Sequence, residues 1–184
     1  MGFMKISKRW GLSLIVLCAL GAAFFLYWPR QVHLDVQGVK YHLGEANAGH
    51  EELVRVKIDS EVWKDWKGAR TFSGTIDIQG SDIPLTESEQ KIKINLGEGA
   101  GSRLIAYNGY HEITGPFRYI YGSFYADDPL RNVTINVFEQ KEDGGSEWSS
   151  DSGLMVSAPA SNRTEALEVA NKLMKKDMRG EALK

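Results

Sequence analysis

The residue types best suited to chemistry lie in one short stretch that mixes histidine with carboxylate side chains. His42, Glu45 and His50 fall within nine positions, and Glu51 follows directly. Zinc accepts imidazole nitrogen and carboxylate oxygen, so these residues could form a zinc site. However, the HExxH spacing of metalloproteases is absent, and the intervening LGEANAG is typical of a loop. We therefore expect solvated polar side chains here, and neither a bound metal nor a cofactor.

Other familiar catalytic and binding patterns are incomplete. GEGAG at 97–101 lacks the Lys-Ser or Lys-Thr of a phosphate-binding loop, which favours a hairpin loop. Asp127, Asp128 and the acidic stretch KEDGGSEWSSDSG offer oxygen ligands without the spacing of a calcium loop. No GxSxG motif occurs. We therefore expect no catalytic residues and a non-enzymatic protein. The alternative is an envelope hydrolase in which distant acids and histidines, such as His42 and His50, converge in the fold.

Aromatic side chains concentrate in residues 107–125, YNGYHEITGPFRYIYGSFY, which hold seven of the fourteen Phe and Tyr. Packing within a sheet is one interpretation, because aromatic rings bury large areas. The other is a groove lined by Tyr110, Tyr119 and Tyr121 that binds a ligand, since tyrosine combines an apolar ring with a polar tip. Strand alternation would place four residues on one face: Phe117, Tyr119, Tyr121 and Tyr125.

The elements that would position these residues are mostly strands. Apolar and polar residues alternate in TFSGTIDIQ and in three further stretches, around 54–62, 92–96 and 133–137. This alternation predicts an antiparallel sheet of about six to eight strands with one solvated face. Asn108-Gly109 predicts a tight hairpin turn that places Tyr107 opposite Tyr110.

One helix is predicted near residues 162–176. Asn162 can cap its first turn while Glu165 reaches back to the cap. The apolar residues at helical spacing are Ala166, Leu167, Ala170, Leu173 and Met174. Since an open sheet needs a cover, we expect this C-terminal helix to pack on the sheet in one α+β domain of residues 31–184.

An uncharged apolar run extends from Gly11 to Trp28, after three cationic residues, and reaches the minimum length of a membrane-spanning helix. Trp10 and Trp28 would then lie at the two membrane interfaces. The positive flank would keep residues 1–10 in the cytoplasm. We therefore expect a transmembrane signal anchor over residues 11–28, inserted in the lipid bilayer, and a single-pass cell-membrane protein whose bulk is extracytoplasmic.

Two alternatives to the anchor remain open. Small residues from Gly21 to Ala23 could form a signal-peptide cleavage site, although cleavage would leave an exposed apolar amino terminus. Lipid modification of Cys18 is less favoured, because bulky Val16 and Leu17 precede it.

The remainder of the chain is acidic and lacks cysteine. Residues 31–184 hold all 24 Asp and Glu but only 18 of the 22 Lys and Arg, a formal balance of −6. This balance argues against nucleic acid as a partner, because phosphate binding needs clustered cations. The absence of cysteine excludes disulfides and thiolate metal sites there, and it favours a bacterial origin.

Two stretches, GLMVSAPASNRTEALEVANKLM and FSGTIDIQG, resemble a group of small uncharacterised proteins of Gram-positive bacteria that are single-pass or signal-bearing and extracytoplasmic. The resemblance covers most of residues 70–176. It implies a domain of sheet plus helix, and it transfers no activity and no functional residues. We expect a membrane-anchored binding or accessory protein with a protein or glycan partner, in an envelope sensing or transport complex.

Overall fold

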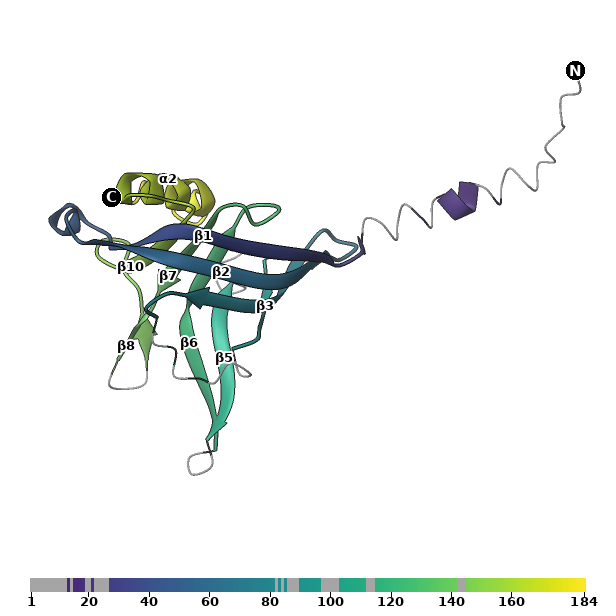
Figure 1. Ribbon diagram of the computed structural model, residues 1–184, viewed down its shortest axis with the longest axis horizontal. Helices are drawn as coiled ribbons and strands as arrows, with labels where there is room; N and C mark the ends of the chain where they lie inside the picture. Colours follow the sequence, from purple (N-terminus) through teal and green to yellow (C-terminus); the bar gives the residue numbers. More distant parts are fainter. Residues whose placement is uncertain are drawn as a thin grey trace, which may run out of the picture.

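The computed structural model describes residues 13, 15–18, 21, 27–81, 83, 85, 90–96, 103–111, 115–141 and 145–184. Eight antiparallel strands form one sheet in the order β4-β3-β2-β1-β10-β7-β6-β5 (Figure 1). The strands are β1 (Arg30–His42), β2 (Glu51–Lys64), β3 (Arg70–Ile78), β4 (Ile92–Asn95), β5 (Leu104–His111), β6 (Gly115–Ala126), β7 (Val133–Val137) and β10 (Leu154–Ala158). The short strands β8 (Glu139–Gln140) and β9 (Ser146–Glu147) pair separately, and the 3-10 helix η1 (Glu45–Asn47) follows β1.

Alternation of apolar and polar residues determines which face of the sheet turns inward. In β2, Val54, Val56 and Ile58 are buried while the residues between them are exposed. Their side chains meet those of the other strands in one core, because the sheet curls until it is nearly barrel-shaped. The edge strands β4 and β5 approach within 8 Å between Cα atoms. The inner face of the sheet is therefore filled by side chains.

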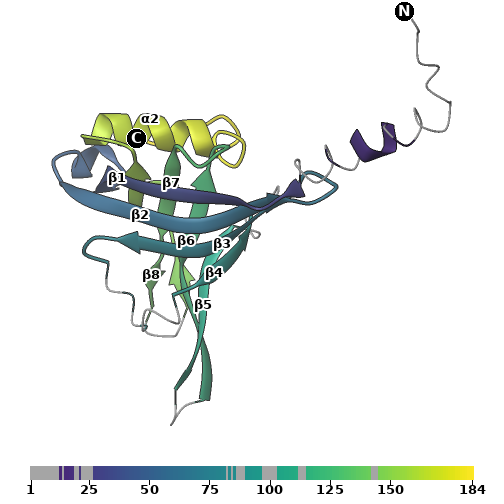
Figure 2. The same ribbon diagram turned by 45° about the vertical axis from the view of Figure 1, so that its right-hand side comes forward.

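The helix α2 (Arg163–Met174) covers part of the outer face, across β1, β10, β7 and β6 (Figures 1 and 2). Asn162 caps the helix by accepting a hydrogen bond of 3.0 Å from the backbone N–H of Glu165. The Glu165 carboxylate accepts from the N–H of Ser161, the residue before the cap, at 2.8 Å. Hydrogen bonds from the hydroxyl and N–H of Ser161 lower the pKa of Glu165. The Asn162 cap predicted from the sequence is confirmed, whereas Glu165 reaches Ser161, one residue before the cap.

The predicted transmembrane anchor is wrong. No helix among the described residues is long and apolar enough to cross a membrane. Within residues 11–28, the helical positions that the structure describes are 13, 15–18, 21 and 27. The longest described helix, α2, has 12 residues and spans about 18 Å at 1.5 Å per residue, against a hydrocarbon layer of about 30 Å. The same finding contradicts the expected localisation as a single-pass cell-membrane protein with an extracytoplasmic bulk.

The predicted fold class also needs correction. The chain is mostly an antiparallel sheet, nearly barrel-shaped, rather than an α+β domain preceded by a transmembrane helix. The elements with defined bounds include one α-helix, α2, and the three-residue η1. The reason is that the sheet closes most of its core by curling, so α2 covers only a second, smaller cluster that includes Tyr41 and Met155.

The predicted hairpin turn is wrong as well. Asn108 and Gly109 lie inside β5, and Tyr107 is opposite Tyr119 rather than Tyr110. Gly109 pairs with Phe117, whose ring occupies the space that a Cβ atom on Gly109 would need. Glycine is therefore used here to receive an aromatic ring across the strands rather than to make a turn.

Candidate functional site

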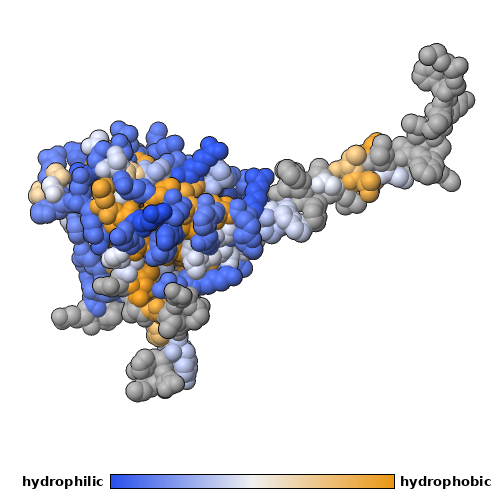
Figure 3. Space-filling model, in the orientation of Figure 1, coloured by the Kyte–Doolittle hydropathy of each residue, from blue (hydrophilic) through white to orange (hydrophobic). Residues whose placement is uncertain are grey.

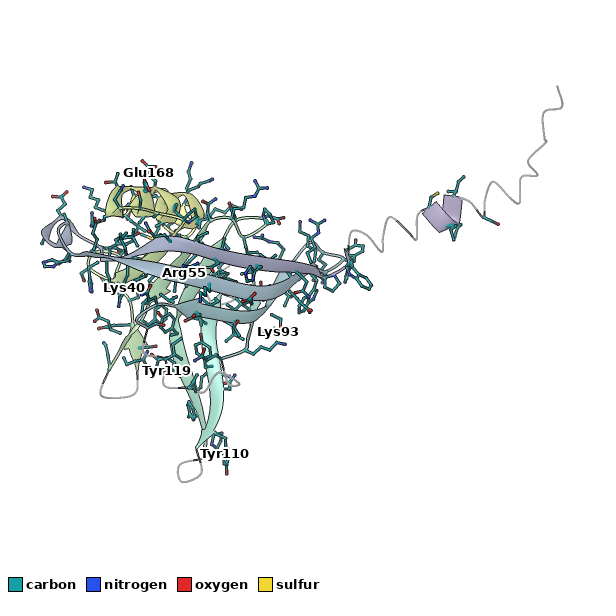
Figure 4. All side chains as sticks on the ribbon, viewed as in Figure 1. Lys40, Arg55, Lys93, Tyr110, Tyr119 and Glu168 are labelled. Atoms are coloured by element: carbon teal, nitrogen blue, oxygen red, sulfur yellow. The ribbon has the colours of Figure 1, made fainter. Side chains whose placement is uncertain are left out.

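β5 and β6 continue past the rest of the sheet as a two-stranded arm, defined here as residues 106–111 and 115–120 (Figures 1 and 2). The other edge strand of the curled sheet, β4, approaches β5 but has only 4 residues, against 8 in β5. Figure 4 shows Tyr110 near the end of the arm and Tyr119 closer to the body. An isolated pair of strands is marginally stable in water, so side-chain packing must support the arm.

Three tyrosines supply that packing at the base of the arm. The rings of Tyr107 and Tyr119 stack across the strands with centroids 6.4 Å apart. Tyr107 is 1% exposed and Tyr121 is 7% exposed, and both belong to the inner core, whereas Tyr119 is half-buried. Burial raises the pKa of Tyr121 to about 12, although a hydrogen bond with Ser81 works in the opposite direction. Tyr121 therefore lies among core side chains and Tyr119 at their margin.

A β-bulge separates the arm from the rest of β6. Ile105 is opposite Gly122 and Ala106 is opposite Ile120, so Tyr121 is an extra residue on β6. The bulge reverses the alternation that follows it. Tyr125 consequently lies on the outer face beneath α2, with the guanidinium of Arg103 4.9 Å from its ring centre. The predicted shared face is wrong for Tyr125.

The outer edge of β5 has no hydrogen-bonded neighbour in the part of the chain that the structure describes, although β4 approaches it. β5 is the last strand of the sheet order, and no described backbone group hydrogen-bonds to its edge between Ile105 and His111. The sequence LIAYNGY at 104–110 contains neither a charged residue nor proline. Natural edge strands usually carry such residues, which prevent pairing with another chain. This edge is therefore suited to accept an added strand.

The side chains of the arm are mostly apolar or aromatic. Tyr110 is 70% exposed, Pro116 is exposed and Ile120 is half-buried. The one charged side chain that the structure describes on the arm is Arg118, whose Nε donates to the Asn108 side-chain oxygen at 3.1 Å. On the face seen in Figure 3, an orange apolar strip runs from the body toward the arm between hydrophilic residues. Apolar side chains of an extended ligand could pack on such a surface.

The histidines singled out in the sequence lie elsewhere. His42 and His50 border an open depression between the end of β1 and the start of β2, together with Glu51. The His42 ring nitrogen Nδ1 lies 3.1 Å from the Ser152 carbonyl oxygen, and the Glu51 carboxylate accepts from the Arg163 N–H at 2.6 Å. Among the described residues, no group of three or more His, Cys, Asp and Glu side chains is placed to hold a metal. The hydrolase hypothesis stays a prediction.

The remaining predicted residues fall into two groups. Trp10, the GEGAG loop and the acidic pair at 142–143 lie outside the described residues. Trp28 is described, is 57% exposed and lies just before β1. The Asp127 carboxylate stabilises the loop after β6, because it accepts hydrogen bonds from the backbone N–H groups of Arg131 and Asn132 at 2.8 and 2.9 Å.

Comparison of the chain with protein-family models, curated proteins and solved structures finds no match. The resemblance to uncharacterised proteins of Gram-positive bacteria therefore stays a prediction. The open edge of β5 is the feature that sequence reasoning missed. The lack of charge and proline across LIAYNGY is a detectable sign of this edge, but the Asn108-Gly109 dipeptide predicts a turn that divides the strand.

Proposed function

We propose that the protein is a non-enzymatic binding or accessory protein that accepts an extended peptide segment of a protein partner along β5. The observation that carries this proposal is the open edge of β5 on an arm that projects from the body. Strand addition supplies affinity through main-chain hydrogen bonds and specificity through alternate side chains. In this arrangement Tyr110, on β5 itself, contacts side chains of the added segment, whereas Tyr119 lies one strand further away on β6 and supports Tyr107.

The composition of the arm supports a protein partner of low local charge. Arg118 is its one described charged side chain, and Asn108 already occupies one of its N–H groups. A strongly acidic or basic partner would find little to pair with there. Aromatic and aliphatic side chains gain most at such a surface, because burial of apolar area gives about 25 cal/mol per Å².

The test is to pan a library of random extended peptides against the full-length protein and measure enriched peptides by fluorescence anisotropy. Replacement Asn108→Lys adds a charge at an exposed position of the open edge, which should weaken binding at least about tenfold. Tyr110→Ala should weaken it about tenfold as well, since an exposed aromatic contact is removed.

The matched control is Gln31→Lys, which adds the same charge at an exposed position of β1, beside Glu61. It should leave peptide binding unchanged, and melting temperatures should confirm that all variants are folded. The proposal fails if no peptide is enriched, or if the Asn108→Lys and Gln31→Lys variants bind the enriched peptides equally well.

A further inference from the structure

A small pocket lies where β1 begins and β2 ends. Figure 1 shows these strand ends far from the arm. Its volume is about 90 Å³. Val32, Val62 and Leu130 line it, together with Trp28 and Trp63. The pocket is separate from the β5 edge in both sequence and position.

The far wall of the pocket is a loop held in one conformation. Leu130 adopts a left-handed backbone conformation with φ 67° and is nevertheless 2% exposed. A bulky residue adopts this conformation only when its surroundings impose it. Its N–H donates to the Asp127 carbonyl oxygen at 2.9 Å, and Arg70 donates to the same oxygen at 3.1 Å. The wall is therefore preformed, which lowers the entropic cost of binding.

The rim of the pocket carries more positive than negative charge. Lys64 Nζ lies 2.8 Å from a carboxylate oxygen of Asp128, and Arg70 lies 3.8 Å from the other oxygen. Arg30 also lines the pocket and has no ion-pair partner among the described residues. The pKa of Asp128 is lowered chiefly by the hydrogen bond from Lys64, with further effects from Arg70 and Arg30. Three cations thus surround one carboxylate, which leaves charge for a second anion.

The size of the pocket limits the apolar part of its ligand. A protein cavity of about 150 Å³ holds benzene, which has six heavy atoms, so 90 Å³ accommodates about three or four. The aliphatic side chains of Val32, Val62 and Leu130 favour carbon at these positions. A charged group attached to this short chain would reach Arg30 and Lys64 at the rim.

We propose that this pocket binds a short-chain carboxylate, with about three carbons against the side chains of Val32, Val62 and Leu130 and the carboxylate at Arg30 and Lys64. Guanidinium pairs with carboxylate through two parallel hydrogen bonds, so Arg30 is the principal anion ligand. Lys64 then bridges the ligand and Asp128. This binding is independent of strand addition at β5.

The experiment is a titration of the full-length protein with butyrate, followed through the five tryptophan indole N–H signals by nuclear magnetic resonance. The signals of Trp28 and Trp63 should shift and saturate, whereas Trp148, which packs against the cluster beneath α2, should not. Acetate, with two fewer methylene groups, should bind about tenfold more weakly. Neutral butyramide should also bind about tenfold more weakly.

Substitutions of Arg30 and Lys64 test whether these rim cations bind the carboxylate of butyrate. Arg30 is exposed, and its replacement by Gln should reduce the affinity for butyrate by about fivefold or more. Lys64→Gln should have the same effect. The control Lys67→Gln removes a cation that lies over Trp66, outside the pocket, and should have no effect. The proposal is overturned if butyrate produces no saturable shift at Trp28 and Trp63, or if Arg30→Gln binds butyrate as tightly as the unmodified protein.

Discussion

Replacement of Phe124 by alanine is expected to lower the free energy of unfolding by about 3 to 5 kcal/mol. The Phe124 side chain is fully buried, and its ring centre lies 5.4 Å from that of Phe72 on β3. This contact joins β6 to β3 across the interior of the curled sheet, so its loss removes both transfer energy and packing between distant strands. Urea unfolding followed by far-ultraviolet circular dichroism measures the effect.

The control for this prediction is Tyr110→Ala, which removes a ring of similar size at the exposed end of the arm. Its effect on unfolding should stay within about 0.5 kcal/mol. If Phe124→Ala costs no more than Tyr110→Ala, the interior of the sheet is not packed as described.

Gly122→Ala should destabilise the protein by about 3 kcal/mol, at the upper end of the range for overpacked sites. Gly122 lies opposite Ile105 at the bulge, and an added Cβ atom would overlap the carbonyl oxygen of Asn136 on β7. That oxygen belongs to the backbone of a paired strand, so it cannot rotate away. The melting temperature and the urea midpoint should both fall.

Gly49→Ala is the matched control, because a Cβ atom at Gly49 would meet no other atom within 4 Å. Its effect should stay within about 0.5 kcal/mol. Equal stability of the two variants would contradict the close approach of β6 and β7 at the bulge.

The elements that could be predicted from sequence are those with local causes. The buried positions of β2 follow from alternation of Val54, Val56 and Ile58 with polar residues, because a strand turns successive side chains to opposite faces. The start of α2 follows from Asn162 and Glu165, whose hydrogen bonds stay within one turn. Neither feature depends on distant parts of the chain.

The elements that could not be predicted depend on a partner strand. The bulge at Tyr121 exists only in the register of β6 against β5, so alternation alone put Tyr125 on the wrong face. Asn108-Gly109 has a turn-like composition, but the ring of Phe117 fills the space at Gly109 and keeps the strand continuous. The membrane anchor predicted at 11–28 rests on the length and composition of the apolar run alone.

The two proposed binding sites also depend on parts of the chain that are distant in sequence. Arg30, Lys64 and Asp128 come from the start of β1, the end of β2 and the loop after β6, and only the curled sheet brings them together. The open edge of β5 follows from the order of the strands, which local sequence does not encode. Both sites are therefore products of topology rather than of motifs.

Amide hydrogen exchange along β5 tests the central claim, the open edge, most directly. In an edge strand every second N–H points away from the neighbouring strand, so exchange from Ala106 to His111 should alternate between slow and fast. Met155 to Ser157 of β10, paired on both sides by β1 and β7, should exchange slowly throughout. Alternation in β5 is the predicted result, whereas uniformly slow exchange across Ala106–His111 would show that the edge is covered and would contradict the account.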